Sequence, residues 1–346
     1  MIDAASGLAA RGHAAVLLGR PGAAWLGAAA DAGVAVRADI RGAWVQRVFR
    51  VRAAMRDERP DVVIVKGKKA ARMAAWGRAT GGGGRVAFFL GATHELDRGR
   101  WVDRVTWRSV DAGIVVAYGA ARWYLDAGFG PAEKMHVLWK GVDLARFDAA
   151  RGNAASMRAA LGLRAGELAV GTVGRLAWQK GIDDLLAAVR LVLPRLPQAR
   201  FFVAGGGRDA DAVAAAVAAP ELRGAVTLLG PRDDIPSLLA AMDVVVQSSR
   251  REAMAQTTLE GMAIGLPVVS TTTVGADEAI EDGVSGLLVP VGDAPALAAQ
   301  IVALGVDPER RAALGRAARD RIAEHFTQER MLDRCEAILT RISSGS

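Results

Sequence analysis

The sequence predicts an α/β protein built from two Rossmann-like, doubly wound halves that face each other across a cleft. The chain has 346 residues, which is long for one core of this kind and about right for two. Short β-branched runs alternate with longer Ala- and Leu-rich stretches, and strands that alternate with helices form parallel sheets. The alternation restarts after Phe147, which indicates two halves and not one long sheet.

Buried strands are expected in both halves. They span 13–18, 61–65, 85–90, 111–116 and 134–138 in the first half, and 168–173, 199–204, 225–229, 243–247, 267–270 and 286–289 in the second. We therefore expect an N-terminal domain over residues 1–147 and a C-terminal domain over 148–325. The last segment, 326–346, is expected to be helical and can cross back to the first domain.

Composition excludes several classes of protein. With 51% hydrophobic and 23% charged residues and no long uncharged apolar run, the chain is typical of a globular protein without a bilayer-spanning segment. The residues after Met1 lack the basic and apolar stretches of a secretory leader, so we expect a cytoplasmic protein. The single cysteine, Cys335, excludes an internal disulfide and a cysteine metal cluster.

The net charge of +7 and the pI near 10.1 leave two interpretations open. Either the protein has an acidic partner, or its arginines lie on solvated faces of Ala/Arg-rich helices. The chain lacks the motifs of RNA-binding domains and zinc fingers. We therefore expect no nucleic acid partner.

Basic residues follow several expected strands of the first half. Ligands of open α/β sheets bind at the carboxyl ends of strands, so these positions are candidates for an anionic ligand. The alternative is that they are exposed loop charges without a ligand. The candidates are Arg20, Lys66, Lys68, Lys69 and Arg98, and His94 is close to Arg98 in the sequence.

Two cations of the second half lie in a loop between an expected strand and a helix. Arg175 follows the strand, and Lys180 stands five residues later, directly before Gly181. Two such cations can converge on one anion, and a glycine lets the backbone approach it closely. A diphosphate suits this arrangement best, although the same pattern is common among surface charges.

The segment from Ser248 to Ser270 places one carboxylate before an expected helix and a second inside it. A helix that starts near Gln256 would aim its free N–H groups at the cleft, which is a site for an anion. Glu260, one turn into that helix, could reach the hydroxyls of a ribose, and Glu252 could hold the hydroxyls of a sugar. Helix capping is the simpler explanation of the spacing taken alone.

Four motifs in one order favour the functional interpretation. They are G-V-D-L-A-R-F at 141–147, G-R-L at 174–176 with K-G at 180–181, the E-x7-E pair at 252 and 260, and G-A-D-E-A-I with D-G-V-S-G-L-L-V at 275–289. Together they resemble the retaining GT-B-fold glycosyltransferases of family four, the group 1 glycosyl transferases. Residues 85–147 are more weakly similar to the members that build lipopolysaccharide cores.

The resemblance implies a glycosyltransferase that moves a sugar from a nucleotide-diphosphate sugar to a glycan or lipid-linked acceptor, with retention of configuration. Lipopolysaccharide or other cell-envelope glycan biosynthesis would be its setting. No cofactor and no metal ion are implied. The nucleotide sugar is a substrate.

The resemblance also implies roles for particular residues. Arg175 and Lys180 would neutralise the departing diphosphate, Glu252 would hold the donor sugar and Glu260 the ribose. His94 would lie near the sugar, and the basic residues of the first half would face the acceptor. The whole donor-binding set would be Arg175, Lys180, Glu252, Ala253, Met254, Ala255, Gln256, Thr257 and Glu260.

The sequence departs from the family pattern in two places. Ala253 and Ala255 stand where the loop usually has Gly and Pro or Gly, and Gly261 stands where the helix usually has Ala. Met1 already lies in the helix that leads to His13, so the usual first strand and its glycine-rich loop are not found. We therefore expect a first sheet that lacks its first strand, either because the sequence is truncated at its N-terminus or because the sheet is built differently.

Two further patterns each have a structural and a functional interpretation. Asp209 and Asp211 form an Asp-x-Asp pair, but they stand at an expected helix start, so we do not interpret them as a metal site. Residues 98–108 interleave arginines with tryptophans, which would suit peripheral contact with an anionic membrane at its inner face. We favour the alternative, a helix that packs its tryptophans on the core.

Two other functions remain open. A nucleotide-sugar epimerase shares the two-domain fold, although the context of Glu252 and Glu260 argues against it. A degenerate protein that binds the nucleotide sugar without turnover is compatible with the expected loss of the first strand.

Overall fold

The computed structural model describes residues 2–91, 96–97 and 99–345. The chain divides into two compact units, one made of Met1–Trp139 with Glu329–Ser346 and the other of Lys140–Gln328. The division falls before the 147/148 boundary expected from the sequence. Nearly all of the last helix, α16 (Gln328–Ser344), belongs to the first unit.

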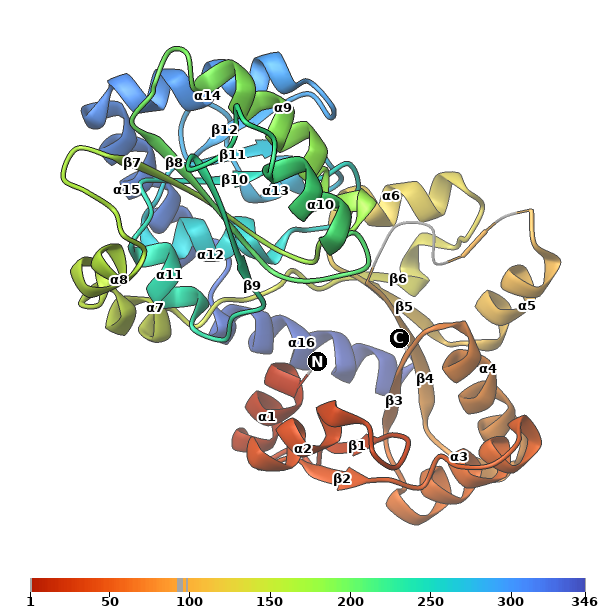
Figure 1. Ribbon diagram of the computed structural model, residues 1–346. Coiled ribbons are helices and arrows are strands. Elements are labelled where there is room, and N and C mark those ends of the chain that lie inside the picture. Colours follow the sequence, from red (N-terminus) through yellow and green to blue (C-terminus); the bar gives the residue numbers. More distant parts are fainter. Residues whose placement is uncertain (1, 92–95, 98, 346) are drawn as a thin grey trace. The chain divides into compact units, whose positions relative to one another are not determined.

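The second unit holds one parallel sheet of six strands in the order β12-β11-β10-β7-β8-β9 (Figure 1). Read from β9 to β12, this is the 3-2-1-4-5-6 order of a doubly wound sheet, and the winding reverses between β7 and β10. The predicted α/β fold with parallel sheets is confirmed. The strands are β7 (Leu168–Val173), β8 (Ala199–Ala204), β9 (Val226–Gly230), β10 (Val244–Gln247), β11 (Val268–Thr271) and β12 (Leu287–Val289).

Helices cover both faces of this sheet. The central strand β10 carries the run Val244, Val245 and Val246, all fully buried, as expected for a parallel strand covered on two sides. One face packs against α9 (Ile182–Val192) and α14 (Ala294–Val306), and the other carries α11 (Ile235–Ala240) and α12 (Gln256–Ile264). The other helical elements are α7 (Leu144–Arg151), α8 (Ala154–Ala160), η3 (Trp178–Lys180), α10 (Ala210–Val217), α13 (Ala276–Ala279) and α15 (Pro308–His325).

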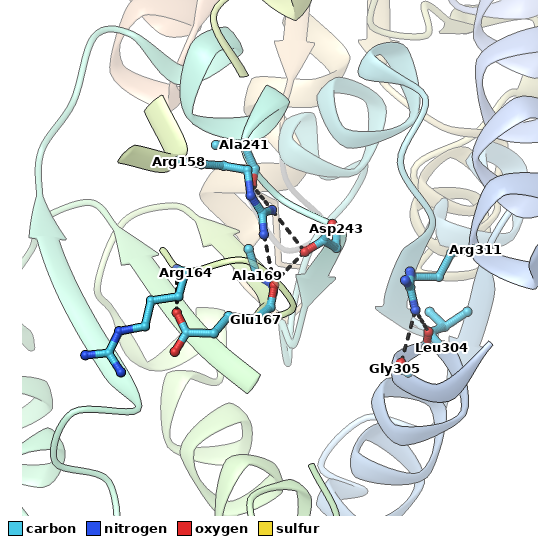
Figure 2. Close-up of polar contacts among 9 residues, drawn as sticks. All are labelled: Arg158, Arg164, Glu167, Ala169, Ala241, Asp243, Leu304, Gly305 and Arg311. Atoms are coloured by element: carbon cyan, nitrogen blue, oxygen red, sulfur yellow. Dashed lines mark hydrogen bonds and ion pairs between the residues drawn. The ribbon is translucent and has the colours of Figure 1, made fainter. Parts of the chain in front are cut away.

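The amino ends of β7 and β10 are tied together by one carboxylate. Asp243 Oδ2 accepts a hydrogen bond from the Ala169 N–H at 2.7 Å, and the Asp243 N–H donates to the Ala169 carbonyl at 2.8 Å. Arg158 of α8 donates to Asp243 Oδ2 at 3.1 Å and to the carbonyls of Ala241 and Glu167 at 2.9 Å each (Figure 2). These bonds hold together the two strands whose carboxyl ends flank the switch point.

The strands of the first unit lie in two separate parallel sheets, one pairing β1 with β2 and one in the order β3-β4-β5-β6. Among the residues that the structure describes, no strand links the two sheets. Strand β2 was not predicted, because its three residues are mostly exposed and form no buried run. The strands are β1 (Val16–Leu18), β2 (Ala35–Arg37), β3 (Val62–Lys66), β4 (Arg85–Leu90), β5 (Ala112–Val115) and β6 (Met135–Val137).

The C-terminal helix α16 completes the core of the first unit. Leu332 and Ile338 of α16 and Leu8 of α1 (Ile2–Ala10) pack with Ala87 and Ile114 of the four-stranded sheet. Figure 1 shows α3 (Trp44–Glu58), α4 (Lys68–Gly77) and α5 (Trp101–Ser109) on the other side of this sheet. The remaining elements are α2 (Ala24–Asp31), η1 (Arg78–Gly82), α6 (Tyr118–Asp126) and η2 (Ala132–Lys134).

The hydrogen bonds of Arg158 and Asp243 at the amino ends of β7 and β10 predict an effect on stability. Arg158→Ala should lower the free energy of unfolding by roughly 1.5–3 kcal/mol, because hydrogen bonds to charged groups contribute about that much. Urea unfolding measures the change. Arg164→Ala is the matched control, because the Arg164 side chain is exposed and its hydrogen bond to Glu167 comes from the backbone N–H. Equal losses in the two variants would contradict the role given to Arg158.

Candidate active site

Two loops meet at the carboxyl ends of β7 and β10, where the winding of the sheet reverses. We call residues 174–181 the β7 loop and residues 248–255 the β10 loop. The carbonyl of Gln179 accepts hydrogen bonds from the N–H groups of Arg250 and Arg251 at 2.9 and 3.2 Å. The two loops that contain the expected donor-binding residues are therefore joined. In open α/β sheets, this is the position at which ligands bind.

The two loops approach so closely that only glycine fits at position 181. Gly181 has a φ of +59°, and a Cβ on it would collide with the carbonyl oxygen of Ser248. The Ser248 hydroxyl also donates a hydrogen bond to the Lys180 carbonyl at 3.1 Å. The backbone on both sides of Lys180 is thus fixed against the β10 loop.

The crossing of the loops brings Lys180 against Glu252. Lys180 Nζ lies 2.5 Å from Glu252 Oε1, and each side chain is 18% exposed. The stem of the lysine passes over Gly174, where a Cβ would lie 3.2 Å from Lys180 Cε. Two residues that the sequence assigns to one ligand are therefore in direct contact and remain open to solvent.

Buried polar side chains support Glu252 from behind. Gln247 Nε2 donates to Ser249 Oγ at 2.6 Å, and that hydroxyl donates to Glu252 Oε1 at 3.4 Å. The Thr271 hydroxyl donates to the Ser249 carbonyl at 2.5 Å. Gln247, Ser249 and Thr271 are all buried. This chain of hydrogen bonds was not predicted from the sequence. Its only trace in the sequence is the presence of polar residues at the ends of two buried strands.

The start of α12 lies beside the ion pair in sequence and is tied to β7. The Thr257 hydroxyl donates to the Val173 carbonyl at 2.8 Å, and Lys140 Nζ donates to the Met254 carbonyl at 2.7 Å. The N-cap residue, Ala255, offers no side chain to cap the first N–H groups, which lack partners inside the helix. An uncapped helix start of this kind suits an anion.

The departures from the family pattern fit the packing of this segment. Ala255 has a φ of −76°, and Ala253 is not among the residues with positive φ, so neither position requires glycine. A Cβ on Gly261 would lie 3.0 Å from Val245 of β10. Glycine at 261 therefore lets α12 pack tightly on the central strand.

Glu260 lies one turn into α12 and is partly buried. Burial raises the pKa of its carboxyl group to about 6, although Arg146, a hydrogen bond with Gln256, and the charges of Lys140 and Lys180 act in the opposite direction. Arg146, Lys140 and Lys180 are therefore near enough for their charges to act on Glu260. Its charge therefore changes in a pH range that solution experiments can reach.

Arg175 is exposed at the start of the β7 loop, and no ion pair joins it to any residue in the described ranges. The glycine run of residues 205–207 packs behind this loop. Gly205 and Gly207 both have positive φ, and a Cβ on either would collide with the backbone of 174–176. The structure thus holds the backbone around Arg175 and leaves its side chain in solvent.

An aromatic residue on the β7 loop, Trp178, was not singled out from the sequence. The guanidinium carbons of Arg250 and Arg251 lie 5.7 and 5.8 Å from its ring centroid, within the range of cation–π contact. Arg250 is also paired with Asp183 and Asp184 of α9 at 2.6 and 2.7 Å. These contacts connect the β10 loop both to the β7 loop and to the first turn of α9.

The residues assigned to the acceptor lie in the first unit and remain predictions. Lys68 is in an ion pair with Asp103 at 2.7 Å, and the side chain of Asp103 is only 1% exposed, so this lysine neutralises a buried charge. His94 and Arg98 lie outside the described residues. The other candidates are exposed at or just after strand ends, namely Arg20, Lys66 and Lys69.

The described part of the chain was searched for membrane-spanning helices and for metal sites. None of its helices is long and apolar enough to cross a membrane. None of its groups of three or more His, Cys, Asp and Glu residues is arranged to hold a metal ion. Asp209 and Asp211 stand at the start of α10, as the sequence predicts.

Comparison with known proteins identifies relatives of this chain. Residues 167–307, all in the second unit, match the family described as glycosyl transferases group 1. The lipopolysaccharide core biosynthesis glycosyltransferase LpsE of Rhizobium meliloti is 27% identical over 330 residues, which cover 94% of this chain and 90% of that protein. The D-inositol 3-phosphate glycosyltransferase of Segniliparus rotundus is 33% identical, over 60% of this chain and 45% of its own length.

Solved structures share the fold. The complex of Anabaena HepE with UDP-glucose has a TM-score of 0.86 and 22% identity, covering 98% of this chain and 94% of HepE. Sucrose-phosphate synthase of Thermosynechococcus elongatus has a TM-score of 0.82 and 20% identity, covering 99% and 92%. The predicted architecture of two Rossmann-like domains is thereby confirmed.

The buried support of Glu252 predicts a difference between two serines. Ser249→Ala removes the hydroxyl that contacts Glu252, whereas Ser270→Ala removes an equally buried hydroxyl that donates only to the Thr271 carbonyl. Both changes should cost roughly 1–2 kcal/mol of stability. Only Ser249→Ala should lower kcat for glycosyl transfer, by roughly tenfold. Equal kcat values in the two variants would refute the role given to Ser249.

Proposed function

We propose that this chain, a glycosyltransferase similar to the group 1 glycosyl transferases, takes its sugar from a nucleotide-diphosphate sugar. We further propose that transfer retains the anomeric configuration and needs no metal ion. The observation that carries the proposal is the contact between Lys180 and Glu252 at 2.5 Å, at the switch point of a doubly wound sheet. The HepE complex with UDP-glucose supports this choice of donor through its shared fold.

The departing nucleoside diphosphate must be stabilised as negative charge develops on it. Fixed cations and backbone N–H groups can do this without reorganisation and without a metal ion. Lys180, the exposed Arg175 and the uncapped start of α12 supply such groups on adjacent parts of one unit. This grouping supports a metal-independent departure of the diphosphate.

In this proposal, Lys180 changes partner when the donor binds. The free protein holds its ammonium against Glu252. A diphosphate carries more charge than one carboxylate and competes for the lysine, which frees Glu252 Oε1 to accept hydrogen bonds from sugar hydroxyls. Ser249 keeps Glu252 in position during the exchange through its own hydroxyl. The ion pair thus prepares both residues for one ligand.

Glu260 is proposed to accept hydrogen bonds from the ribose hydroxyls of the donor. Its place one turn into α12 puts it beyond the helix start that suits the phosphates, and its position among cations favours the carboxylate form once the pH exceeds about 6. A carboxylate accepts from both hydroxyls of a ribose, whereas the protonated group can accept fewer hydrogen bonds.

The acceptor is proposed to be a glycan or lipid-linked saccharide of the cell envelope. The similarity to LpsE over nearly the whole chain supports this class. The acceptor hydroxyl would attack from the face that the diphosphate leaves, and the departing phosphate oxygen would take its proton. No side-chain nucleophile is required in such a reaction.

The mechanism predicts how Lys180 and metal ions affect turnover. Hydrolysis of UDP-glucose without acceptor should be unchanged by excess EDTA, because protein groups stabilise the leaving diphosphate. Lys180→Ala should lower kcat by roughly 10²–10³-fold, the usual loss when one charge-stabilising donor is removed. Arg223→Ala, an exposed arginine far from the β7 and β10 loops in sequence, is the control. Loss of activity in EDTA, or full activity of Lys180→Ala, would rule out this mechanism. Binding of UDP-glucose without any turnover would instead favour a degenerate protein.

The raised pKa of Glu260 predicts a pH dependence of donor binding. The carboxylate is charged above its pKa of about 6, so the Kd for UDP-glucose should rise several-fold as the pH falls from about 7.5 to about 5. The diphosphate of UDP-glucose is a diester and does not titrate in this range. In Glu260→Gln, the affinity should be weaker and independent of pH over the same interval. Calorimetry that finds the same pH profile in both proteins would contradict the role of Glu260.

A further inference from the structure

The positive charge of this protein is concentrated in its first unit. That unit contains 24 Lys and Arg against 15 Asp and Glu, a net charge of +9, whereas the second unit contains 20 against 22, a net charge of −2. Residues 41–108 alone contain 16 Lys and Arg against 6 Asp and Glu. This segment, which includes α3, α4 and α5, therefore accounts for the whole positive net charge of the first unit.

Four of the seven exposed aromatic side chains in the described part of the first unit lie in the same segment. Trp44 and Phe49 of α3, Trp76 of α4 and Trp101 of α5 are 46%, 60%, 59% and 75% exposed. In the described part of the second unit, Trp178 is the only aromatic residue among the exposed large hydrophobics. Aromatic residues are normally buried or partnered, so four on three consecutive helices call for an explanation.

The three helices lie next to one another. α3 packs along α4, and α4 packs along α5, on one side of the four-stranded sheet (Figure 1). Trp107 of α5 turns inward and is buried, as the sequence analysis favoured, but Trp101 and Val105 of the same helix are exposed. The exposed apolar residues therefore belong to the outward faces of the helices and do not support the core.

The same helices, and the residues just before α3, also carry basic side chains. Asp103 and Asp111 neutralise Lys68, Arg78 and Arg85. Other basic residues are exposed, and no ion pair joins them to a residue in the described ranges: these are Arg41, Arg56, Lys69, Arg104 and Arg108. The outer face therefore combines aromatic rings with uncompensated positive charge.

We propose that the outer faces of α3, α4 and α5, called here the α3–α5 face, dock on an anionic lipid bilayer. Tryptophan and phenylalanine insert at the boundary of headgroups and acyl chains, and arginines attract the anionic headgroups. Exposed aliphatic residues such as Val45 and Val105 add apolar area that a bilayer can bury and a nucleic acid backbone cannot. The inference rests on this surface alone and does not depend on the proposed reaction.

Flotation of the full chain with vesicles tests the proposal. The protein should float with phosphatidylcholine vesicles that contain about 30 mol % phosphatidylglycerol and should not float with pure phosphatidylcholine, and binding should weaken as salt is raised. Trp44→Ser with Phe49→Ser should lower the partition coefficient by roughly tenfold or more, because two apolar anchors are lost. Arg41→Ala with Arg56→Ala should lower it by roughly 30-fold, at about 1 kcal/mol per charge, and reduce the salt dependence.

A matched control comes from the second unit. Val306 and Arg316 are exposed there, and Val306→Ser with Arg316→Ala should leave vesicle binding unchanged. All variants should keep their thermal stability and their affinity for UDP-glucose, which separates this proposal from the donor site. Equal binding to neutral and anionic vesicles, or unchanged binding of both the aromatic and the arginine variant, would overturn it. A dimer that these two variants abolish, without vesicle binding, would instead make this face an interface between copies of the chain.

Discussion

The proposed active site depends on the close crossing of two loops at the carboxyl ends of β7 and β10. Gly181 permits the crossing, because its left-handed backbone passes where a Cβ would collide with Ser248. At the amino ends of the same strands, the hydrogen bonds between Asp243 and Ala169 also hold β7 and β10 together. With both ends fixed, Lys180 and Glu252 are held in contact although 72 positions separate them in the chain. A change that separated the loops would remove the cation and the carboxylate from a common ligand at once.

The second unit has no excess of positive charge, so the affinity proposed for a diphosphate must come from the local arrangement of a few groups. Lys180 is held by a carboxylate, Glu260 is partly protonated near neutral pH because it is buried, and the start of α12 carries no cap. In the proposed mechanism, an anion can bind to Lys180 and to the uncapped start of α12, and hydroxyl groups can donate to Glu252 and Glu260. Binding free energy that is released in this way can support departure of the leaving group.

The sequence predicts the elements of this fold well because its signals are local. Buried β-branched runs mark the strands, and Lys180 and Glu252 stand in motifs that follow two of them. Contacts between distant segments leave no such signal. The pairing of Lys68 with Asp103, the support of Glu252 by Ser249, and the packing of α16 into the first unit all depend on tertiary placement. The short strand β2 was missed because its residues are mostly exposed.

Calorimetric titration of UDP at about pH 8 tests the central claim, that Lys180 leaves Glu252 to bind the diphosphate. Lys180→Ala should weaken UDP binding by at least roughly tenfold, or about 1.4 kcal/mol. Glu252→Gln should bind UDP as tightly as the unmodified chain or more tightly, because the lysine no longer has to leave a carboxylate. An equal loss of affinity in both variants, or no loss in Lys180→Ala, would contradict the account.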